Sequence, residues 1–408
     1  MTQKCQMLLG LAATISAAVL DLPVEIRNSY SSVKFSIGSP PKEHNLLLDT
    51  GSSTSWLINT DCTESSCPDR SSPYYTRQPY NASASSTSVD LDIPATIPFL
   101  GGDVSGQTYQ DTFSVPGDDN GLEWNQTFLS ANTSTWRFIT SDGFLGLGFS
   151  SIAEPNTSTL VETLLQQSAL DSPRFGLFYG TNLRDTGPQN GVLTLGSSHE
   201  NKYVDGETIY TPLRKEDPYQ LWRAPLRSVN VLVAQRPNLP NSTVQIINGK
   251  LPTTSLTPGT FPRANTTWPM FGAGRAVFDT GAGRLSLPDE IIGAVYFNLG
   301  WNLTKLYSGE ERMTCAHLNA SWAITLTLGE AEQANDVSFS LRGDEFTIPG
   351  DQCMLPVDAS GATGFALVGA AFLRRVYSVW DFGAHNADGY EPRIGFGRLK
   401  PEWDYMYQ

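Results

Sequence analysis

The sequence predicts a mainly β protein folded as two lobes. The chain of 408 residues is long enough for two separate cores, because a single domain most often has about 100–150 residues. Its 36 glycines and 26 prolines gather in turn-like clusters, which is typical of many short strands joined by tight turns. An apolar strand that runs into Asp-Thr-Gly occurs once in each half, at residues 46–51 and 276–281. These three observations together favour two related β lobes.

Composition and charge exclude several other classes of protein. With 40% apolar and only 17% charged residues, the chain is expected to be globular rather than disordered. A net charge of −14 argues against nucleic acid as a partner and leaves no basic patch for an anionic membrane surface. The four histidines are scattered without His-x-x-x-His spacing, so no metal site is expected. The serine-hydrolase signature Gly-x-Ser-x-Gly does not occur.

The Asp-Thr-Gly motif occurs twice, and acid–base chemistry with a shared proton requires two Asp carboxyls. One copy would most often be a surface turn whose Asp accepts backbone N–H bonds. Two Asp carboxyls within hydrogen-bond reach cannot both ionise cheaply, so they share one proton and their pKa values separate. Such a pair can take a proton from water with one carboxyl and donate a proton with the other. Asp49 and Asp279 are therefore the predicted catalytic pair.

The two motifs resemble those of the pepsin-like aspartic endopeptidases, of the secreted eukaryotic and fungal type, over about residues 30–398. The resemblance implies a bilobal fold, two pseudo-symmetric β lobes with a cleft between them, and hydrolysis of internal peptide bonds by water without a cofactor. It implies that Thr50 and Thr280 bind the backbone of the opposite lobe and keep the pair coplanar. A second echo, residues 141–148 and 365–369, resembles the strands that pass beneath the catalytic turns. The positions that correspond to substrate-binding residues are Gly51, Ser52, Phe99, Gly101, Gly281 and Ala282.

Residues 70–110 are expected to form the flap, a hairpin that closes over bound peptide, with its turn at Gly101 and Gly102. Phe99 stands where the family usually has a tyrosine whose hydroxyl bonds a tryptophan, here Trp56. A phenyl ring can cover the peptide but cannot make that bond, so the flap is expected to be positioned differently. The apolar candidates for the cleft side are Phe99, Trp136 and Phe138.

Ala282 stands where the family usually has Thr or Ser, so Asp279 lacks a hydroxyl donor that Ser52 supplies to Asp49. Losing a donor to a carboxylate raises its pKa. Ala370 stands where many members have Asp, and losing that negative neighbour acts in the opposite direction. We expect an optimum between mildly acidic and near-neutral pH.

The expected elements follow in chain order. Residues 1–19 are a signal peptide, and 20–200 form an N-terminal lobe in which a hairpin leads to Asp49. An amphipathic helix is expected over residues 159–170. Residues 201–400 form a C-terminal lobe with Asp279, a helix from Pro288 and a surface insertion over 234–270. Strands over 376–380 and 393–397 are expected to close this lobe, before a tail over 401–408.

The first residues and the cysteines predict secretion. Lys4 precedes an apolar run, and Ala17 and Ala18 suit cleavage nearby. No later run approaches the roughly 20 apolar residues of a spanning helix, and the tail lacks a lipid-anchor signal. We therefore expect a secreted, extracellular, soluble monomer that acts on proteins or peptides, with no membrane anchor. The interval before the first strand is shorter than the family's prosegment, so either no proteolytic activation is needed or the sequence is truncated.

Four cysteines remain after the signal peptide, and they allow three pairings. The pairing Cys62–Cys67 with Cys315–Cys353 keeps each bridge within one lobe and resembles the disulfides of the family. Glycosylation is expected because the chain has eight Asn-x-Ser/Thr sequons, at Asn81, Asn125, Asn132, Asn156, Asn241, Asn265, Asn302 and Asn319.

The competing interpretation is a pepsin-like fold used as a non-catalytic binder or inhibitor. Proteins of that kind usually have damaged catalytic motifs, whereas both Asp, both Thr and both Gly are intact here. A glycosidase would also need two acids, but that interpretation leaves the repeated Asp-Thr-Gly unexplained. The sequence therefore favours the enzyme.

Overall fold

The computed structural model describes residues 18–69, 71, 75–118, 121–184, 188–234, 266–270, 274–329, 335–348 and 353–407. In these ranges the fold is mainly β, as predicted, and its strands form two large sheets. The first sheet has thirteen strands: β1 (Leu20–Arg27), β2 (Tyr30–Ile37), β3 (Lys42–Asp49), β4 (Trp56–Ile58), β5 (Val89–Phe99), β6 (Gly102–Ser114), β7 (Glu123–Ser134), β8 (Gly143–Gly146), β9 (Arg174–Phe178), β10 (Gly191–Leu195), β11 (Ile209–Pro212), β20 (Val376–Asp381) and β21 (Arg393–Arg398). The second has eight: β12 (Arg223–Val233), β13 (Thr266–Pro269), β14 (Arg275–Phe278), β15 (Leu285–Leu287), β16 (Trp322–Leu328), β17 (Val337–Arg342), β18 (Val357–Ala359) and β19 (Phe365–Val368).

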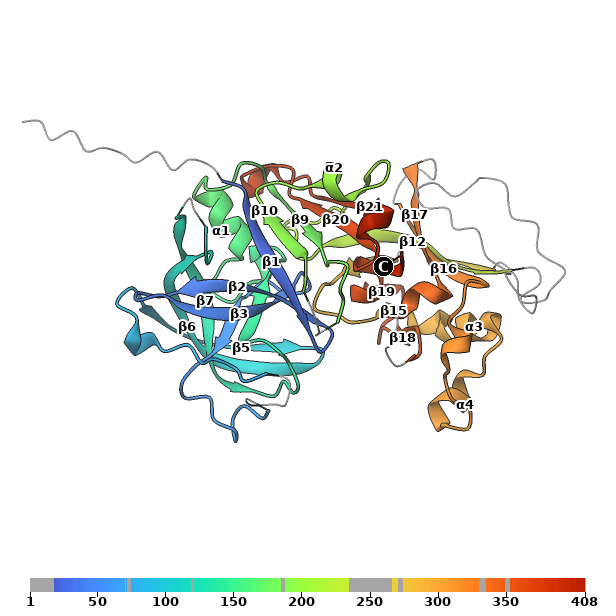
Figure 1. Ribbon diagram of the computed structural model, residues 1–408, viewed down its shortest axis with the longest axis horizontal. Helices are drawn as coiled ribbons and strands as arrows, with labels where there is room; N and C mark the ends of the chain where they lie inside the picture. Colours follow the sequence, from blue (N-terminus) through green and yellow to red (C-terminus); the bar gives the residue numbers. More distant parts are fainter. Residues whose placement is uncertain are drawn as a thin grey trace, which may run out of the picture.

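The two halves of the chain lie side by side and share part of one sheet. Figure 1 shows β2, β3, β5, β6 and β7 on one side of the molecule and β12 and β15 to β19 on the other, with β9, β10 and β20 between them. We expected β20 and β21 to close the second lobe. Instead β20 pairs antiparallel with β9 of the first half, with Ser378 opposite Leu177. The C-terminal strands therefore join the two halves.

Each predicted Asp lies at the end of a strand that is buried beside a parallel neighbour. β3 pairs parallel with β8, and β14 pairs parallel with β19. The two repeated segments found in the sequence therefore pair with each other in the same way in each half. Leu46, Leu47 and Leu48 are all buried. A strand buried on both faces requires this continuous apolar run rather than an alternating one.

The hairpin that we expected to be the flap consists of β5 and β6, and it is a shorter segment than the predicted 70–110. Phe99 pairs with Gly102, so its turn consists of Leu100 and Gly101. β5 is the outermost strand of its sheet, and it contains Pro94 and Pro98. An edge strand tolerates proline because a missing N–H on its free side removes no ladder bond.

The helices are short. The one predicted over 159–170 is α1, where the side chain of Thr159 accepts a hydrogen bond from the Glu162 N–H. α3 begins directly after Pro288, as predicted, and ends at Gly300, whose φ of 84° is left-handed. The α-helices are α1 (Leu160–Gln166), α2 (Glu200–Tyr203), α3 (Asp289–Leu299), α4 (Leu303–Ser308) and α5 (Ala370–Leu373). The 3₁₀ turns are Ala82–Ala84, Ser150–Ile152, Cys315–His317, Gly343–Phe346, Ala387–Gly389, Pro401–Trp403 and Tyr405–Tyr407.

Two predicted segments fall largely outside the described residues. Most of the signal peptide, residues 1–17, and most of the insertion, residues 235–265, belong to these. The end of the insertion range is a strand, since Thr266–Pro269 forms β13 and pairs with β12. Among the residues that the structure describes, no helix is long and apolar enough to cross a membrane.

Candidate active site

Asp49 and Asp279 lie next to each other in the structure. Asp49 is the last residue of β3, and Asp279 directly follows β14, so each is delivered by the buried strand of its own half. Only 4% of the surface of Asp49 is exposed. The two carboxyls are hydrogen-bonded to each other. The doubled motif thus forms one site.

The two threonines after these aspartates bind across the pair in a reciprocal pattern. The Thr50 hydroxyl donates to the carbonyl oxygen of Phe278 at 2.9 Å and accepts from the Thr280 N–H at 3.0 Å. The Thr280 hydroxyl donates to the carbonyl oxygen of Leu48 at 2.8 Å and accepts from the Thr50 N–H at 3.0 Å. All four bonds are buried. They join the two Asp-Thr-Gly turns, which lie far apart in the sequence, into one rigid unit.

The glycines of the two motifs allow each turn to approach the opposite carboxyl. A Cβ atom on Gly51 would lie 2.5 Å from the Cγ and Oδ2 atoms of Asp279. A Cβ atom on Gly281 would lie 2.7 Å from Asp49 Oδ1. Each glycine also donates its N–H to the Asp of its own motif, at 3.0 Å for Gly51 and 2.8 Å for Gly281. Only glycine gives a backbone this close to both carboxyls.

Both carboxyls have raised pKa values. Burial raises the pKa of Asp49 well above its ordinary value, and the negative charge of Asp279 raises it further. Burial likewise raises the pKa of Asp279, while the N–H donated by Gly281 lowers it. The common cause is that losing the second proton would place two negative charges side by side away from water. The pair therefore retains one shared proton to a higher pH than isolated carboxyls would.

The hydrogen bonds to the two carboxyls are not symmetric. The Ser52 hydroxyl donates to Asp49 Oδ2 at 2.5 Å, and this bond lowers the pKa of Asp49. Ala282, at the matching position of the second motif, has no hydroxyl to donate to Asp279. Burial raises the pKa of Asp279, and the Gly281 N–H, the Asp49 carboxyl and other backbone donors lower it, without a hydroxyl donor.

The predicted flap residue Phe99 lies in an aromatic cluster together with Trp136, Phe144 and Trp56. Its ring centroid is 5.8 Å from that of Trp136 and 5.5 Å from that of Phe144, and Trp56 lies 4.9 Å from Phe144. A Cβ atom on Gly101 would lie 2.5 Å from the indole of Trp136, so the flap turn rests on that ring. The indole N–H of Trp56 is buried and has no hydrogen-bond partner in the described part of the chain. This is the expected result of having phenylalanine at position 99, because its ring has no hydroxyl to accept the bond. The third apolar candidate, Phe138, is 53% exposed.

Sequence reasoning missed a buried polar cluster around Asp142. Asp142 accepts hydrogen bonds from the Asn45 N–H at 2.8 Å, the Gln78 N–H at 2.5 Å and the Tyr75 hydroxyl at 3.0 Å. Burial raises its pKa to about 6. The cluster ties the segment before the flap to β3, four residues before Asp49. An acid inside the apolar run over 141–148 was the available signal.

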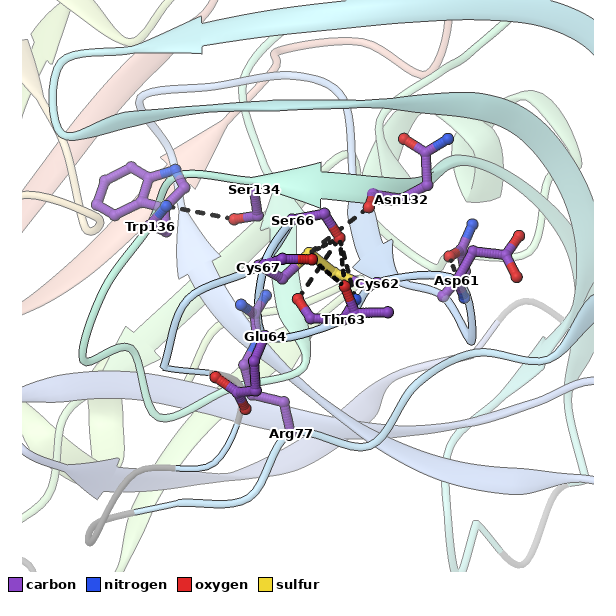
Figure 2. Close-up of a disulfide and its surroundings, with 12 residues drawn as sticks. Asp61, Cys62, Thr63, Glu64, Ser66, Cys67, Arg77, Asn132, Ser134 and Trp136 are labelled. Atoms are coloured by element: carbon purple, nitrogen blue, oxygen red, sulfur yellow. Dashed lines mark hydrogen bonds between the residues drawn. A yellow bond between two sulfur atoms is a disulfide. The ribbon is translucent and has the colours of Figure 1, made fainter.

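The disulfides are the predicted ones, Cys62–Cys67 and Cys315–Cys353. Figure 2 shows the first beneath the end of β7, with Trp136 and Ser134 nearby. The backbone N–H of Trp136 donates to the Ser134 hydroxyl at 3.3 Å, and the backbone N–H of Ser134 donates to the carbonyl oxygen of Ser66 at 2.9 Å. The loop that this bridge closes therefore supports the segment on which the flap turn rests.

Comparison with known proteins agrees with this geometry. A family model described as eukaryotic aspartyl protease matches residues 30–248 and 262–389. A probable vacuolar protease A of Trichophyton verrucosum is 26% identical over 365 residues, which cover 86% of this chain and 75% of the relative. A vacuolar protease A of Aspergillus fumigatus is 25% identical, covering 87% and 77%. A gastricsin of Cavia porcellus is 24% identical, covering 95% and 84%.

Proposed function

The chain belongs to the eukaryotic aspartyl protease family and is an aspartic-type endopeptidase, and from that premise we propose that Asp49 and Asp279 are its catalytic pair. The observation that carries this proposal is the reciprocal bonding of Thr50 and Thr280, which sets the two carboxyls side by side. Both residues come from one chain, so a single copy holds the complete pair, and we propose that the enzyme acts as a monomer.

The proposed reaction needs one proton on the pair. The ionised carboxyl removes a proton from a water molecule, and the water oxygen attacks the carbonyl carbon of the peptide bond. The protonated carboxyl donates its proton to the carbonyl oxygen as the bond to carbon forms. The resulting tetrahedral intermediate then breaks its C–N bond as the amine nitrogen gains a proton, which leaves an amine and a carboxylic acid. Burial strengthens each of these charge interactions.

We propose extended peptides with hydrophobic residues on either side of the cleaved bond as substrates. Support comes from the ring of Phe99 at the end of β5, from the ring of Trp136 against which the flap turn packs, and from Leu100 in that turn, which is 89% exposed. An exposed large apolar side chain at this place gains binding energy when a substrate covers it.

The experiment that tests this function is incubation of the protein with a mixed peptide library over a pH series, with and without pepstatin. We expect cleavage between hydrophobic residues that pepstatin abolishes. Cleavage that pepstatin leaves unchanged would contradict the proposed pair.

We also propose that the chain follows the secretory route and is released outside the cell. Two disulfides and the eight sequons support an oxidising compartment. Two of the relatives described above are named vacuolar, so a vacuole is the alternative destination. Recovery of the active protein from culture medium rather than from a vacuolar fraction distinguishes the two.

The hydroxyl missing at position 282 gives a prediction about pH. In Ala282→Thr, a new donor to Asp279 favours the charged carboxylate and lowers its pKa. The active, singly protonated pair then loses its last proton at lower pH, so the basic limb of the kcat/KM profile moves toward acid. The measurement is the pH–rate profile of parent and variant on one peptide. A basic limb that stays in place would show that this hydroxyl does not set the titration of the pair.

A further inference from the structure

Asn132 is the extra residue of a β-bulge. Ser105 and Gly106 are consecutive in β6, but they lie opposite Thr133 and Ala131 of β7, so Asn132 between them has no partner. A Cβ atom on Gly106 would lie 2.1 Å from the carbonyl oxygen of Ser130, so glycine is needed for the close approach of the strands here. Bulges of this kind redirect a side chain. Asn132 is exposed, and in Figure 2 its carboxamide points away from the disulfide.

The side chain of Asn132 lines a groove of about 360 Å³ on the flap hairpin. Pro94 and Thr96 of β5 and Ser105 and Gln107 of β6 form much of its wall. Thr96 and Ser105 offer hydroxyls 2.9 Å apart, and Gln107 offers an amide. Hydroxyl and amide groups beside the apolar ring of a proline suit a sugar, which presents hydroxyls on its rim and C–H groups on its faces.

Three of the six sequon asparagines in the described ranges, Asn125, Asn132 and Asn156, make no side-chain hydrogen bond, and of these only Asn132 lines the groove. Asn302 accepts from the Lys305 N–H at 3.1 Å to cap α4, and Asn319 donates to the carbonyl oxygen of Ala316 at 2.7 Å. The Asn132 carboxamide makes no hydrogen bond within the described ranges. Asn125, also in β7 and also exposed, lies outside the groove.

The groove lies against β5, the outermost strand of its sheet. A long edge strand presents unpaired N–H and C=O groups that can pair with another chain. Pro94 and Pro98 remove two of those N–H groups, and a bulky group seated in the groove would cover others. An occupant anchored at Asn132 would therefore protect this edge.

We propose that Asn132 carries an N-linked glycan whose first sugar is seated in the groove between β5, β6 and Asn132. This rests on the secretory route proposed above. In the transfer step, Asn132 Nδ2 forms a bond to C1 of the first sugar of a lipid-diphosphate-linked oligosaccharide. The bond from C1 to the diphosphate oxygen breaks, the nitrogen loses one proton, and the lipid diphosphate leaves with the bonding electrons.

The test uses the full-length chain produced in a eukaryotic secretory host. Glycopeptide mass spectrometry is expected to find Asn132 occupied. An amidase that cleaves the bond between sugar and asparagine should release the Asn132 glycan from the folded protein roughly tenfold more slowly than the glycan of Asn125 or another occupied sequon, because hydrogen bonds to the groove must first break. After denaturation the rates should be equal.

Two variants separate seating from occupancy. Replacing Thr96 and Ser105 together by alanine should leave Asn132 occupied but bring its release rate close to that of the other sites. Asn132→Gln should remove one glycan and leave kcat/KM on a short peptide unchanged. Occupied sequons elsewhere with a bare Asn132, or equal release rates from the folded protein, would overturn the inference. Sugar at none of the sequons would overturn the secretory route, and this inference with it, while leaving the catalytic pair untouched.

Discussion

Asp49→Asn is expected to abolish peptide hydrolysis and to leave the protein folded. The substitution keeps the volume of the side chain and one oxygen that can accept from the Gly51 N–H. The amide nitrogen takes the place of Oδ2 and can donate to the Ser52 hydroxyl, which donates to Oδ2 in the parent, so the turn should stay folded. The substitution removes the proton-sharing carboxyl, and the loss of an acid–base group of this kind costs up to about 10⁴-fold in rate. The measurement is kcat/KM on a cleaved peptide, with thermal unfolding of the same sample.

A matched control is Asp111→Asn. Asp111 is also fully buried and accepts hydrogen bonds from Tyr80 and Thr87, but it lies outside the catalytic turns. We expect this variant to lose stability while retaining activity below its melting temperature. An Asp49→Asn variant that cleaves as fast as the parent would show that the assignment of the pair is wrong.

Gly51→Ala is expected to lower kcat by about 100-fold, the effect of misplacing a catalytic group by roughly 1 Å. The added methyl group would lie 2.5 Å from the carboxyl of Asp279, so either that carboxyl or the turn must move. The peptide bonds and charges of the site are otherwise unchanged. Steady-state kinetics on one peptide would show the loss mainly in kcat rather than in KM.

Gly283→Ala provides the control for this second prediction. Gly283 follows the second motif, and a Cβ atom there would meet no atom within 4 Å. We expect kcat of Gly283→Ala to stay close to that of the parent. Equal losses in the two variants would mean that removing any glycine near the motifs is harmful and that the close approach at Gly51 has no special role.

The parts of the fold that could be predicted from sequence are those with a local signal. The apolar run before each Asp predicted β3 and β14, and the second echo predicted β8 and β19 beside them. Apolar residues with a helical period of 3.6 predicted α1. Pro288 before α3 and the acids Asp289 and Glu290 in its first turn predicted where α3 begins. Each of these signals lies within a few residues of the element that it specifies.

The missing parts depend on partners far away in the chain. The pairing of β20 with β9 could not be predicted from a local pattern, because about half of the sequence separates the two strands. The apolar sequence of each strand would suit any buried sheet and does not identify the partner strand. The flap shows a similar limit, since its turn was predicted one residue late at Gly101 and Gly102. Its contact with Trp136 depends on the path of another strand. The burial of Asp142 could not be predicted, because burial is predicted from the periodicity of apolar residues and a single polar residue does not contribute to that pattern.

The candidate site could be predicted further than the fold around it. The identities of Asp49, Asp279 and their glycines followed from the repeated motif, and the structure places all four together. The sequence could not predict how opposing effects on the two pKa values balance. Burial raises both pKa values, while a hydroxyl donor is present at Ser52 and absent at Ala282. That balance depends on three-dimensional surroundings.

A double-mutant cycle over Asp49→Asn and Asp279→Asn, measured as kcat/KM on one peptide, tests most directly whether the two carboxyls act as one catalytic pair. Two carboxyls that share one proton act as a unit, so removing either should eliminate essentially all of the acceleration that the pair provides. We expect each single variant to lose activity to the same extent and the double variant to lose no more. Losses that multiply in the double variant, or a single variant that keeps substantial activity, would contradict this expectation.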